Sequence, residues 1–476
     1  MKSSINSPQE QSTKTFCWES LRSKTEGARK HNFVAVQNPF DVLKELSMKS
    51  IAIIGGGITG VTTAYALAKR GFEVTLFERH RYSAMETSFA NGGQLSASNA
   101  EVWNHWSNIV KGIKWMLKGD APLLINPKPS WHKLSWFAEF IAAMPDYETN
   151  TVETTKLAIA SRNYLFDWAT QENIDFDLKK EGILHIYRDK AGFDHAAKVS
   201  KLLAKGGLSR QAVTPKEMLA IEPTLAGSYY GGFFTESDST GDIHKFTTGL
   251  AIAAQRLGVK ILYDQNVKSL RNLNGVFSAH VYSQNTAPTQ HNFDGVVICA
   301  GVESRGFAQQ LGDRVNIYPV KGYSITVNLK DTPSQEGAPT VSLLDDETKL
   351  VTSRLGVDRF RVAGTAEFNG YNRDIRADRI KPLINWVEEC FPRINTSSVV
   401  PWSGLRPMLP NMMPRVGQGL ANNVFYNTGH GHLGWTLSAV TANMIAEKIQ
   451  QSMKPWCIDV RARVAKLNCS LATTTH

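Results

Sequence analysis

The feature that most constrains the fold is the stretch IAIIGGGITG at residues 51–60, an apolar β-branched run that breaks into spaced glycines. The run predicts a buried strand, and apolar residues at helical spacing over 61–70 predict a helix directly after it. In such a unit Gly55 allows the tight turn, Gly57 lets the backbone approach a pyrophosphate, and Gly60 lets the helix pack against the strand. The N–H groups of the helix N-terminus then face phosphate. The stretch therefore predicts a dinucleotide site.

A second strand is expected at residues 73–77, and it ends at Glu78. An acidic residue about 20 positions after the glycines binds ribose hydroxyls in dinucleotide sites. Because this residue is acidic, it argues against a 2′-phosphate and favours FAD or NAD over NADP. The alternative interpretation is a glycine-rich turn in an unrelated α/β protein.

Length and charge limit the possible classes of protein. The 476 residues are enough for roughly two to three structural units. The net charge of +10 permits contact with anionic lipid or nucleic acid, but no block of like charges concentrates it, which favours a dispersed basic surface. No apolar run reaches the roughly 18 to 20 residues of a spanning helix, so any membrane contact is expected to be peripheral. The 5 cysteines lack zinc or C-x-x-C spacing, which predicts no metal site and fits a reducing compartment.

Residues 1–48 differ in composition from the rest. They are rich in Ser, Thr, Lys and Gln, with poor hydrophobic periodicity, so a poorly ordered N-terminal extension is expected. They lack the continuous apolar segment of a secretory signal. Met48, just before the motif strand, is a candidate for the natural start.

Two segments in the first third carry further signals. The loop SAMETSFANGGQLSAS at residues 83–98 is small and polar, which indicates close approach to a ligand. Residues 101–140 concentrate tryptophan at Trp103, Trp106, Trp115, Trp131 and Trp136. This density favours packing between layers, and the alternative is a substrate lid or an interfacial surface.

The second half of the chain contains further strand, glycine-turn and helix signals like those of the opening stretch. DGVVICAG at residues 294–301 predicts a buried parallel strand whose carboxyl end approaches a ligand. Strands alternating with turns over residues 318–364 predict a separate antiparallel sheet. A strand at 424–427 is followed by a turn containing Gly429, Gly431 and Gly434 and a closing helix, which predicts a second helix N-terminus aimed at an electron-rich group.

Several motifs together resemble a known family. They are GGGITG with Glu78, TSFANGGQLS, the GD-x-H-K-F-T segment at 241–247, VVICAG, YPVKGYS at 318–324, WSGLRPMLP at 402–410 and NTGHGHLGWT at 427–436. From about residue 50 to about residue 449 the chain resembles the FAD-dependent D-amino-acid oxidase superfamily, and within it the bacterial D-amino-acid dehydrogenase small-subunit group. The last two motifs are the most specific.

This resemblance implies a mixed α/β and α+β fold, with a discontinuous Rossmann-type FAD-binding domain and a second substrate domain built on an antiparallel sheet. We expect the FAD-binding domain to comprise residues 49–100, 205–310 and 400–452, the substrate domain residues 101–204 and 311–399, and a C-terminal tail residues 453–476.

The resemblance also implies which residues contact FAD. The glycine turn and the next strand supply Gly55, Gly57, Ile58, Thr59, Gly60, Glu78 and Arg79. The small-residue loop supplies Ser88, Asn91, Gly92 and Gln94, near the ribityl chain and the flavin ring, and Val267 contacts adenine through its backbone. The later strand ends supply Ala300, Gly301, Gly429, His430, Gly431, Leu433 and Gly434. Lys321 and Gly322 are expected to pass close to the ring. The cofactor is predicted to be non-covalent, because no cysteine lies in the expected late loop.

The substrate residue implied by the resemblance is Arg406, which pairs with the substrate carboxylate. A planar guanidinium binds a carboxylate through two parallel hydrogen bonds and so fixes the α-carbon. Tyr323 is a further candidate donor to the carboxylate, although a tyrosine in a sheet is more often simply packed. His430 is a candidate acid or base, although its glycine neighbours favour a role in backbone positioning.

The predicted reaction is the FAD-dependent oxidation of a D-amino acid, or a similar small amino or imino acid, to a 2-oxo acid and ammonia. A protein base is not required, because a neutral substrate amine can expel hydride from the α-carbon to flavin N5. Electrons are expected to pass to a quinone or another acceptor. An oxygen-using oxidase of the glycine or sarcosine type is the alternative, and a flavin domain that modifies tRNA is the alternative from another class. We expect a cytoplasmic protein, with peripheral contact at the cytoplasmic face of the inner membrane as a hypothesis and no nucleic-acid partner.

Overall fold

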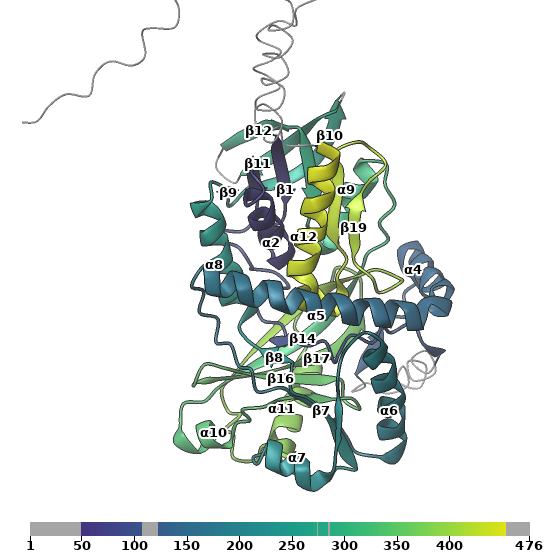
Figure 1. Ribbon diagram of the computed structural model, residues 1–476, viewed down its shortest axis with the longest axis vertical. Coiled ribbons are helices and arrows are strands. Elements are labelled where there is room, and N and C mark those ends of the chain that lie inside the picture. Colours follow the sequence, from purple (N-terminus) through teal and green to yellow (C-terminus); the bar gives the residue numbers. More distant parts are fainter. Residues whose placement is uncertain (1–48, 107–121, 274, 284–285, 454–476) are drawn as a thin grey trace, which may run out of the picture. The chain divides into compact units, whose positions relative to one another are not determined.

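The computed structural model describes residues 49–106, 122–273, 275–283 and 286–453 (Figure 1). Its first layer is a six-stranded sheet in the order β19-β20-β13-β1-β2-β9, and β19 is antiparallel to its neighbour whereas the other pairs are parallel. The strands are β1 (Ser50–Ile54), β2 (Glu73–Phe77), β9 (Lys260–Leu262), β13 (Gly295–Ile298), β19 (Arg415–Gln418) and β20 (Val424–Thr428). The predicted dinucleotide-binding strands therefore lie side by side.

Both faces of this sheet are covered, which explains why β1 is apolar throughout. Ile51 and Ile53 belong to a core shared with four helices: α2 (Ile58–Ala68), α5 (Tyr147–Gln171), α8 (Ile243–Arg256) and α12 (Gly434–Met453). Ala52 and Ile54 pack into a second core. That core is closed by α9 (Ser304–Gln310) and by an antiparallel sheet of β10 (Asn266–Leu273), β11 (Val276–Ser283) and β12 (Thr286–Phe293). Alternate side chains of one strand thus face two apolar layers.

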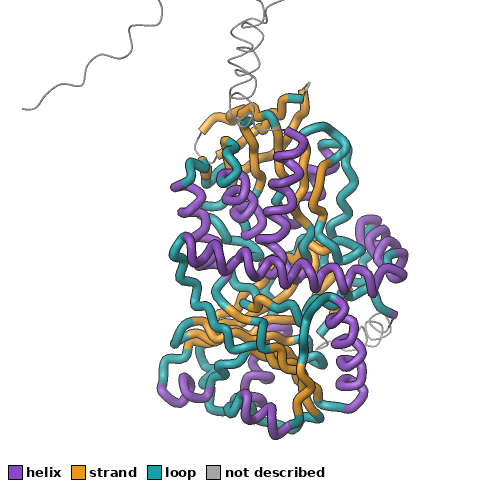
Figure 2. The backbone as a smooth tube through the Cα atoms, viewed as in Figure 1, coloured by secondary structure: helices purple, strands orange, loops and turns teal. Residues whose placement is uncertain are grey.

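A second, nine-stranded sheet has the order β18-β14-β17-β16-β15-β5-β7-β6, with β4 paired to β17 (Figure 2). Its strands are β4 (Leu123–Ile125), β5 (Ile183–Tyr187), β6 (Gln211–Val213), β7 (Gly231–Thr235), β14 (Tyr318–Asn328), β15 (Ser342–Asp345), β16 (Leu350–Leu355), β17 (Arg359–Phe368) and β18 (Val399–Met408). Most pairs are antiparallel, as predicted, but β15 runs parallel to β5 and β17 parallel to β4. The sheet is therefore mixed.

The remaining elements surround the second sheet or join the two sheets. They are β3 (Gln94–Leu95), β8 (Ser239–Thr240), α4 (Trp131–Ala142), α6 (Lys190–Lys205), α7 (Pro215–Ile221), α10 (Thr332–Gly337) and α11 (Ala377–Cys390). Helix α11 buries Leu383, Trp386 and Val387 in the core of the second sheet. Helix α5 is long enough to contact α12 at the first sheet and also α6 (Figure 1).

Local sequence explains how several helices begin. Thr214 caps α7 through a capping box, in which its hydroxyl accepts from the Glu217 N–H and the Glu217 carboxylate accepts from the Thr214 N–H. Asp242 caps α8 by accepting from the N–H groups of His244 and Lys245. Each cap forms within three positions of sequence, so local sequence decides where these two helices begin.

Some sequence expectations lie outside the described residues or stay predictions. Residues 1–48, residues 454–476 and Trp115 are outside the described part. The domain boundaries remain a prediction, and strand pairing places β7 and β18 in the nine-stranded sheet. Of the clustered tryptophans, Trp136 is buried as the packing interpretation predicts, whereas Trp106 and Trp131 are exposed.

Candidate active site

The three motif glycines differ in what surrounds them. Gly55 has φ +107°, and a Cβ there would lie 2.7 Å from the carbonyl oxygen of Cys299. A Cβ on Gly60 would lie 1.8 Å from the oxygen of Gly55, so α2 packs directly against the turn. At Gly57 a Cβ would meet only Ser88 Oγ, at 3.5 Å. Gly57 is thus the position where the backbone is open to a ligand, as the motif predicts.

A cavity of about 460 Å³ lies at this turn. It is built at the carboxyl ends of β1, β2, β13 and β20, where ligands bind in open parallel sheets. Of the predicted cofactor residues it is lined by Gly55, Gly57, Ile58, Thr59, Glu78, Arg79, Ser88, Asn91, Val267, Ala300, Gly301, Gly429, His430, Gly431 and Gly434. Gly60 does not line it, in keeping with its packing role. We call this space the dinucleotide cavity.

Glu78 is fixed by the turn that it follows. Its Oε2 accepts from the N–H of Gly56 at 2.7 Å and its Oε1 from the N–H of His80 at 2.9 Å. Burial raises the pKa of Glu78, and the two backbone hydrogen bonds act against that rise. The carboxylate is therefore held rigidly at the cavity wall, where it can accept from ribose hydroxyls.

The closing turn before α12 is also shaped by glycine, because Gly429 and Gly431 have φ +79° and +59°. His430 between them is buried, and its Nε2 lies 3.0 Å from Thr441 Oγ1. Burial lowers the pKa of His430 to about 3, so the ring is neutral near pH 7. This environment supports the backbone-positioning interpretation of His430 over the acid or base role.

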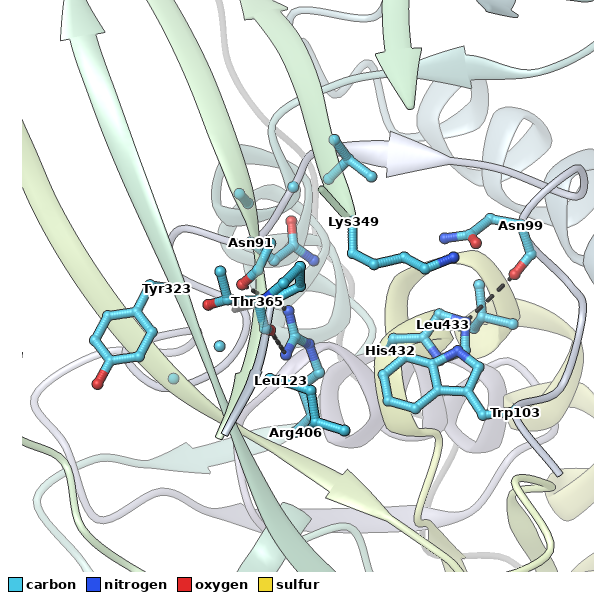
Figure 3. Close-up of a pocket in the computed structure, with 18 of the residues that line it drawn as sticks. Asn91, Asn99, Trp103, Leu123, Tyr323, Lys349, Thr365, Arg406, His432 and Leu433 are labelled. Atoms are coloured by element: carbon cyan, nitrogen blue, oxygen red, sulfur yellow. Dashed lines mark hydrogen bonds between the residues drawn. The ribbon is translucent and has the colours of Figure 1, made fainter. Parts of the chain in front are cut away.

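A second cavity of about 440 Å³ adjoins the first, and we call it the substrate cavity (Figure 3). The side chains or backbone of five positions line both cavities: Thr87, Asn91, Arg406, His432 and Trp435. Three predicted cofactor residues, Gly92, Gln94 and Leu433, line the substrate cavity instead of the dinucleotide cavity. A ligand that spans both spaces would pass between these groups.

Arg406 is the charged centre of the shared region. Its Nη1 donates to the Thr365 carbonyl at 2.7 Å and its Nη2 lies 3.4 Å from the Gly364 carbonyl. Among the described residues no carboxylate lies within ion-pair distance of it, and burial alone lowers its pKa to about 10. A charged guanidinium that is largely removed from water without a counter-ion favours an anionic ligand. A purely structural salt bridge for Arg406 therefore has no partner in the described part of the chain.

Tyr323 lines the substrate cavity, and its hydroxyl already has a protein partner. Its hydroxyl donates to Glu367 Oε2 at 2.6 Å, and the side chain is buried. In Figure 3 the hydroxyl points away from Arg406. The position therefore favours a packed tyrosine over a carboxylate donor, because its donor proton is already used. Lys321 is likewise buried, 3.4 Å from Glu367, and does not line either cavity.

The far side of the substrate cavity carries an ion pair and stacked rings. Lys349 Nζ lies 2.6 Å from Asp346 Oδ1, and Figure 3 shows its side chain across the cavity from Arg406. The Trp103 ring stacks on His432, with centroids 5.0 Å apart. Burial lowers the pKa of His432 to about 4, and its Nε2 lies 3.3 Å from the Asn99 carbonyl. Nε2 therefore carries the proton of a neutral ring.

An aromatic and aliphatic wall adjoins Arg406. It consists of Leu123, Ile125, Trp136, Phe137, Phe140 and Phe368, all of which line the substrate cavity. The pairing of β4 with β17 places Leu123 and Ile125 beside Ala366 and Phe368, directly after Thr365. Trp136 is anchored by donating to the Met408 carbonyl at 2.9 Å, two residues after Arg406 on β18. We call this set the apolar wall.

Sequence reasoning missed Thr87, Trp103, Thr365 and Trp435 as site residues, whereas Gly322, expected to pass close to the ring, lines the substrate cavity. Thr87 and Trp435 lie inside two of the quoted motifs, so the signal for them was present. The roles of Gly322 and Thr365 depend on how β14, β17 and β18 pair, which no local pattern indicates.

The residues present fit FAD. Gly57 leaves backbone open to the dinucleotide cavity, and the buried Trp435 Nε1, which lacks a protein partner, lies where the two cavities meet. Cys299 lines the dinucleotide cavity, but burial raises its pKa to about 12, so it is a thiol and a poor nucleophile. Nothing in its environment favours a covalent link to the cofactor.

The described ranges contain neither a metal cluster nor a membrane-spanning helix. No group of three or more His, Cys, Asp or Glu side chains there is arranged to hold a metal ion. In the same part of the chain, no helix has both the length and the hydropathy that crossing a membrane requires.

The sequence is similar to known proteins along most of its length. Residues 50–448 match the family model described as FAD dependent oxidoreductase (DAO). The D-amino acid dehydrogenase 3 of Mesorhizobium japonicum is 59% identical over 401 residues, which cover 84% of this chain and 96% of the relative. The D-amino acid dehydrogenase of Paramagnetospirillum magneticum is 38% identical over 410 residues, covering 84% and 94%.

Solved structures share the fold at low identity. Glycine oxidase from Geobacillus kaustophilus superposes with a TM-score of 0.66 at 19% identity, covering 87% of this chain and 98% of that one. L-proline dehydrogenase from P. horikoshii gives a TM-score of 0.66 at 18% identity, covering 85% and 94%. These likenesses extend over both sheets.

Proposed function

The chain belongs to the family of FAD dependent oxidoreductases, and from this membership we propose that it binds FAD non-covalently in the dinucleotide cavity and oxidises an amino acid in the substrate cavity. The reaction is the oxidative deamination of a D-amino acid, as the names of its relatives indicate for them. The amino acid and water give a 2-oxo acid and ammonia, and two electrons and two protons pass to an acceptor. These relatives favour amino-acid oxidation over the tRNA-modifying alternative.

The protein's part in this reaction is mainly positioning. Arg406 binds the carboxylate and fixes the α-carbon at the boundary between the cavities. The apolar wall excludes water from the side-chain end. FAD, when bound, supplies the acceptor for hydride. No base is needed when the substrate amine is neutral, and the rings of His430 and His432 remain neutral near pH 7.

The observation that carries this proposal is the unpaired Arg406 at the boundary. Replacing it with Met removes a charge-assisted interaction worth about 1.5 to 3 kcal/mol, so kcat/KM for D-amino acids should fall about 10- to 150-fold or more. Arg406→Lys keeps the charge but loses the two parallel hydrogen bonds, so its kcat/KM should lie between those of Arg406→Met and the unaltered protein. Formation of the 2-oxo acid with an artificial acceptor measures the effect.

The matched control is Arg361→Met. Arg361 is a buried arginine of the same sheet, with its pKa also lowered to about 10 by burial, and it does not line the substrate cavity. We expect the KM of the Arg361→Met variant to match that of the unaltered protein. Equal kinetics for Arg406→Met and the unaltered protein would remove Arg406 from the site.

The electron acceptor is proposed to be a quinone, reached by peripheral contact at the cytoplasmic face of the inner membrane. Support comes from exposed apolar side chains on and near α4: Trp106 (63% exposed), Trp131 (83%), Leu134 (53%) and Ile141 (50%). Side chains of this kind insert into a membrane interface. The alternative acceptor is oxygen, as in a glycine or sarcosine-type oxidase.

Membrane fractions washed with high salt test this part. We expect activity to stay with the membranes, and Trp131→Ser to release it. Activity that is entirely soluble at low salt, or reduced enzyme that oxygen re-oxidises faster than a quinone analogue, would contradict it.

A further inference from the structure

A β-bulge interrupts β17 beside Arg406. Across the pair of β14 and β17, Lys321 is opposite Glu367 but Tyr323 is opposite Gly364, so β17 contains one extra residue at this point. Thr365 lies in the bulge with φ +57°. A β-branched residue is strained in this left-handed region, which glycine or asparagine adopts more easily.

The bulge holds the Arg406 guanidinium from one side. It turns the carbonyl oxygens of Gly364 and Thr365 toward the two terminal nitrogens. From the neighbouring strand Gly322 leaves the space that the group occupies, since a Cβ there would lie 2.4 Å from Arg406 Cζ. A bulge that re-aims groups next to a binding site is a common use of this feature. The remaining N–H groups of the guanidinium are left for a ligand.

The side chain of Thr365 carries a second energetic cost. It is only 7% exposed, and its hydroxyl has no hydrogen-bond partner. Thr365 nevertheless lines the substrate cavity (Figure 3). Rotation about χ1 breaks no hydrogen bond, so the hydroxyl is free to turn toward a ligand. Strain and an unpaired buried hydroxyl at one residue indicate a functional site, where such costs are retained.

We propose that Thr365 is a second substrate-binding residue, whose hydroxyl donates a hydrogen bond to the carboxylate that Arg406 binds. The inference rests on the proposed function, because it takes the ligand to be an amino acid. One bulge then supplies the carbonyl that positions the charged donor and the hydroxyl that assists it. This arrangement explains why threonine, and not glycine, occupies a left-handed position.

Three substitutions separate the hydroxyl from the backbone. Thr365→Val keeps the branched shape and the strain but removes the hydroxyl, Thr365→Gly removes both the strain and the hydroxyl, and Thr365→Ser keeps the hydroxyl. The matched control is Thr235→Val. Thr235 is a buried threonine of the same sheet whose hydroxyl also lacks a partner, but it does not line either cavity.

The probes are D-alanine, propionate and ethylamine, which carry both head groups, the carboxylate alone and the amine alone. Propionate and ethylamine binding to the FAD-loaded protein is measured as ligand-induced thermal stabilisation. Anaerobic reduction of the flavin by D-alanine gives a dissociation constant and a limiting rate. The absorption spectrum of the bound flavin and the melting temperature without ligand report folding of each variant.

We expect Thr365→Val and Thr365→Gly to bind propionate and D-alanine about tenfold more weakly, the factor contributed by a hydrogen bond to a charged group. The limiting reduction rate should change much less. Thr365→Ser should restore binding, and Thr235→Val should bind like the unaltered protein.

Unchanged propionate binding in Thr365→Val, or full binding in Thr365→Gly, would overturn the proposal. A loss confined to ethylamine would also overturn it, because the hydroxyl would then serve the amine. If no D-amino acid reduces the flavin of the unaltered protein, the proposed function fails, whereas the propionate series still decides the role of Thr365.

Discussion

At the scale of single residues, the site is defined by a cation without a counter-ion among the described residues and by histidine rings that carry no charge. Arg406 is surrounded by backbone carbonyls instead of carboxylates, so it is desolvated without charge compensation. Desolvated charges are costly unless paired, which makes a carboxylate ligand the natural partner. Burial also lowers the pKa values of the nearby His430 and His432, so these two rings remain neutral near pH 7.

Buried histidines lead to a prediction about acid stability. Burial lowers the pKa of His430 to about 3 and of His432 to about 4, from the ordinary 6.5. Below pH 6.5 the unfolded chain therefore binds protons that the folded protein does not, so the free energy of unfolding falls as the pH falls from 6.5 toward 4. Each such histidine contributes a slope of about 1.4 kcal/mol per pH unit in that range.

Urea unfolding at pH 7, 6 and 5 measures this dependence. We expect His430→Gln to have a pH slope shallower than that of the unaltered protein by about 1.4 kcal/mol per unit, whatever its stability at pH 7. Identical slopes for the two proteins would show that His430 titrates normally in the folded state.

At the scale of elements, two glycines of the strand–turn–helix unit have different roles: Gly60 allows packing and Gly57 allows ligand binding. A Cβ at Gly60 would collide with the Gly55 carbonyl, whereas a Cβ at Gly57 would make only ordinary contact with protein. The same substitution at two positions of one motif should therefore have different consequences.

We predict that Gly60→Ala destabilises the FAD-free protein by about 1 to 3 kcal/mol, because α2 must shift away from the turn. Gly57→Ala should change the melting temperature of the FAD-free protein little but weaken FAD binding at least about tenfold, since the added methyl enters the pyrophosphate position. Thermal melts and FAD titrations compare the two variants. Unaltered FAD affinity in Gly57→Ala would place the pyrophosphate elsewhere.

Elements β4 and α4, with Phe368 of β17, form the apolar wall, and this leads to a prediction about substrate size. A carboxylate on Arg406 places the substrate side chain beside Leu123 and Phe137. We expect kcat/KM to be higher for D-phenylalanine than for D-alanine, and Phe137→Ala to reduce this preference about tenfold through lost apolar contact. Leu134→Ala, on the exposed side of the same helix, is the control. A preference for D-alanine in the unaltered protein would contradict the assignment.

Local features of the sequence predicted where several of these strands, turns and helices lie, but not how the strands pair. The turn at Gly55 and the strand ending in Glu78 follow from spacing within a few residues. The bulge at Thr365 depends on register between β14 and β17, which lie more than 30 residues apart in the chain. For the same reason the sequence suggested a hydroxyl donor at Tyr323, whereas the structure pairs that hydroxyl with Glu367.

At the scale of the whole described molecule, the two sheets supply different halves of one ligand site. The six-stranded sheet provides the dinucleotide cavity at its carboxyl edge, and the nine-stranded sheet provides Arg406, Thr365 and, together with α4, the apolar wall. The cavities meet at residues that line both, so on the proposed assignment a substrate held by Arg406 would lie next to the cofactor. On this assignment electrons would pass from substrate to cofactor without a protein group between the two.

The most direct test is anaerobic mixing of the FAD-loaded protein with matched D- and L-amino acids while flavin absorbance is recorded. We predict that D-amino acids bleach the flavin, that their L-enantiomers do not, and that one 2-oxo acid forms per flavin reduced. A flavin that stays oxidised with every D-amino acid, or that L-enantiomers reduce equally well, would contradict the assignment of this site to D-amino-acid oxidation.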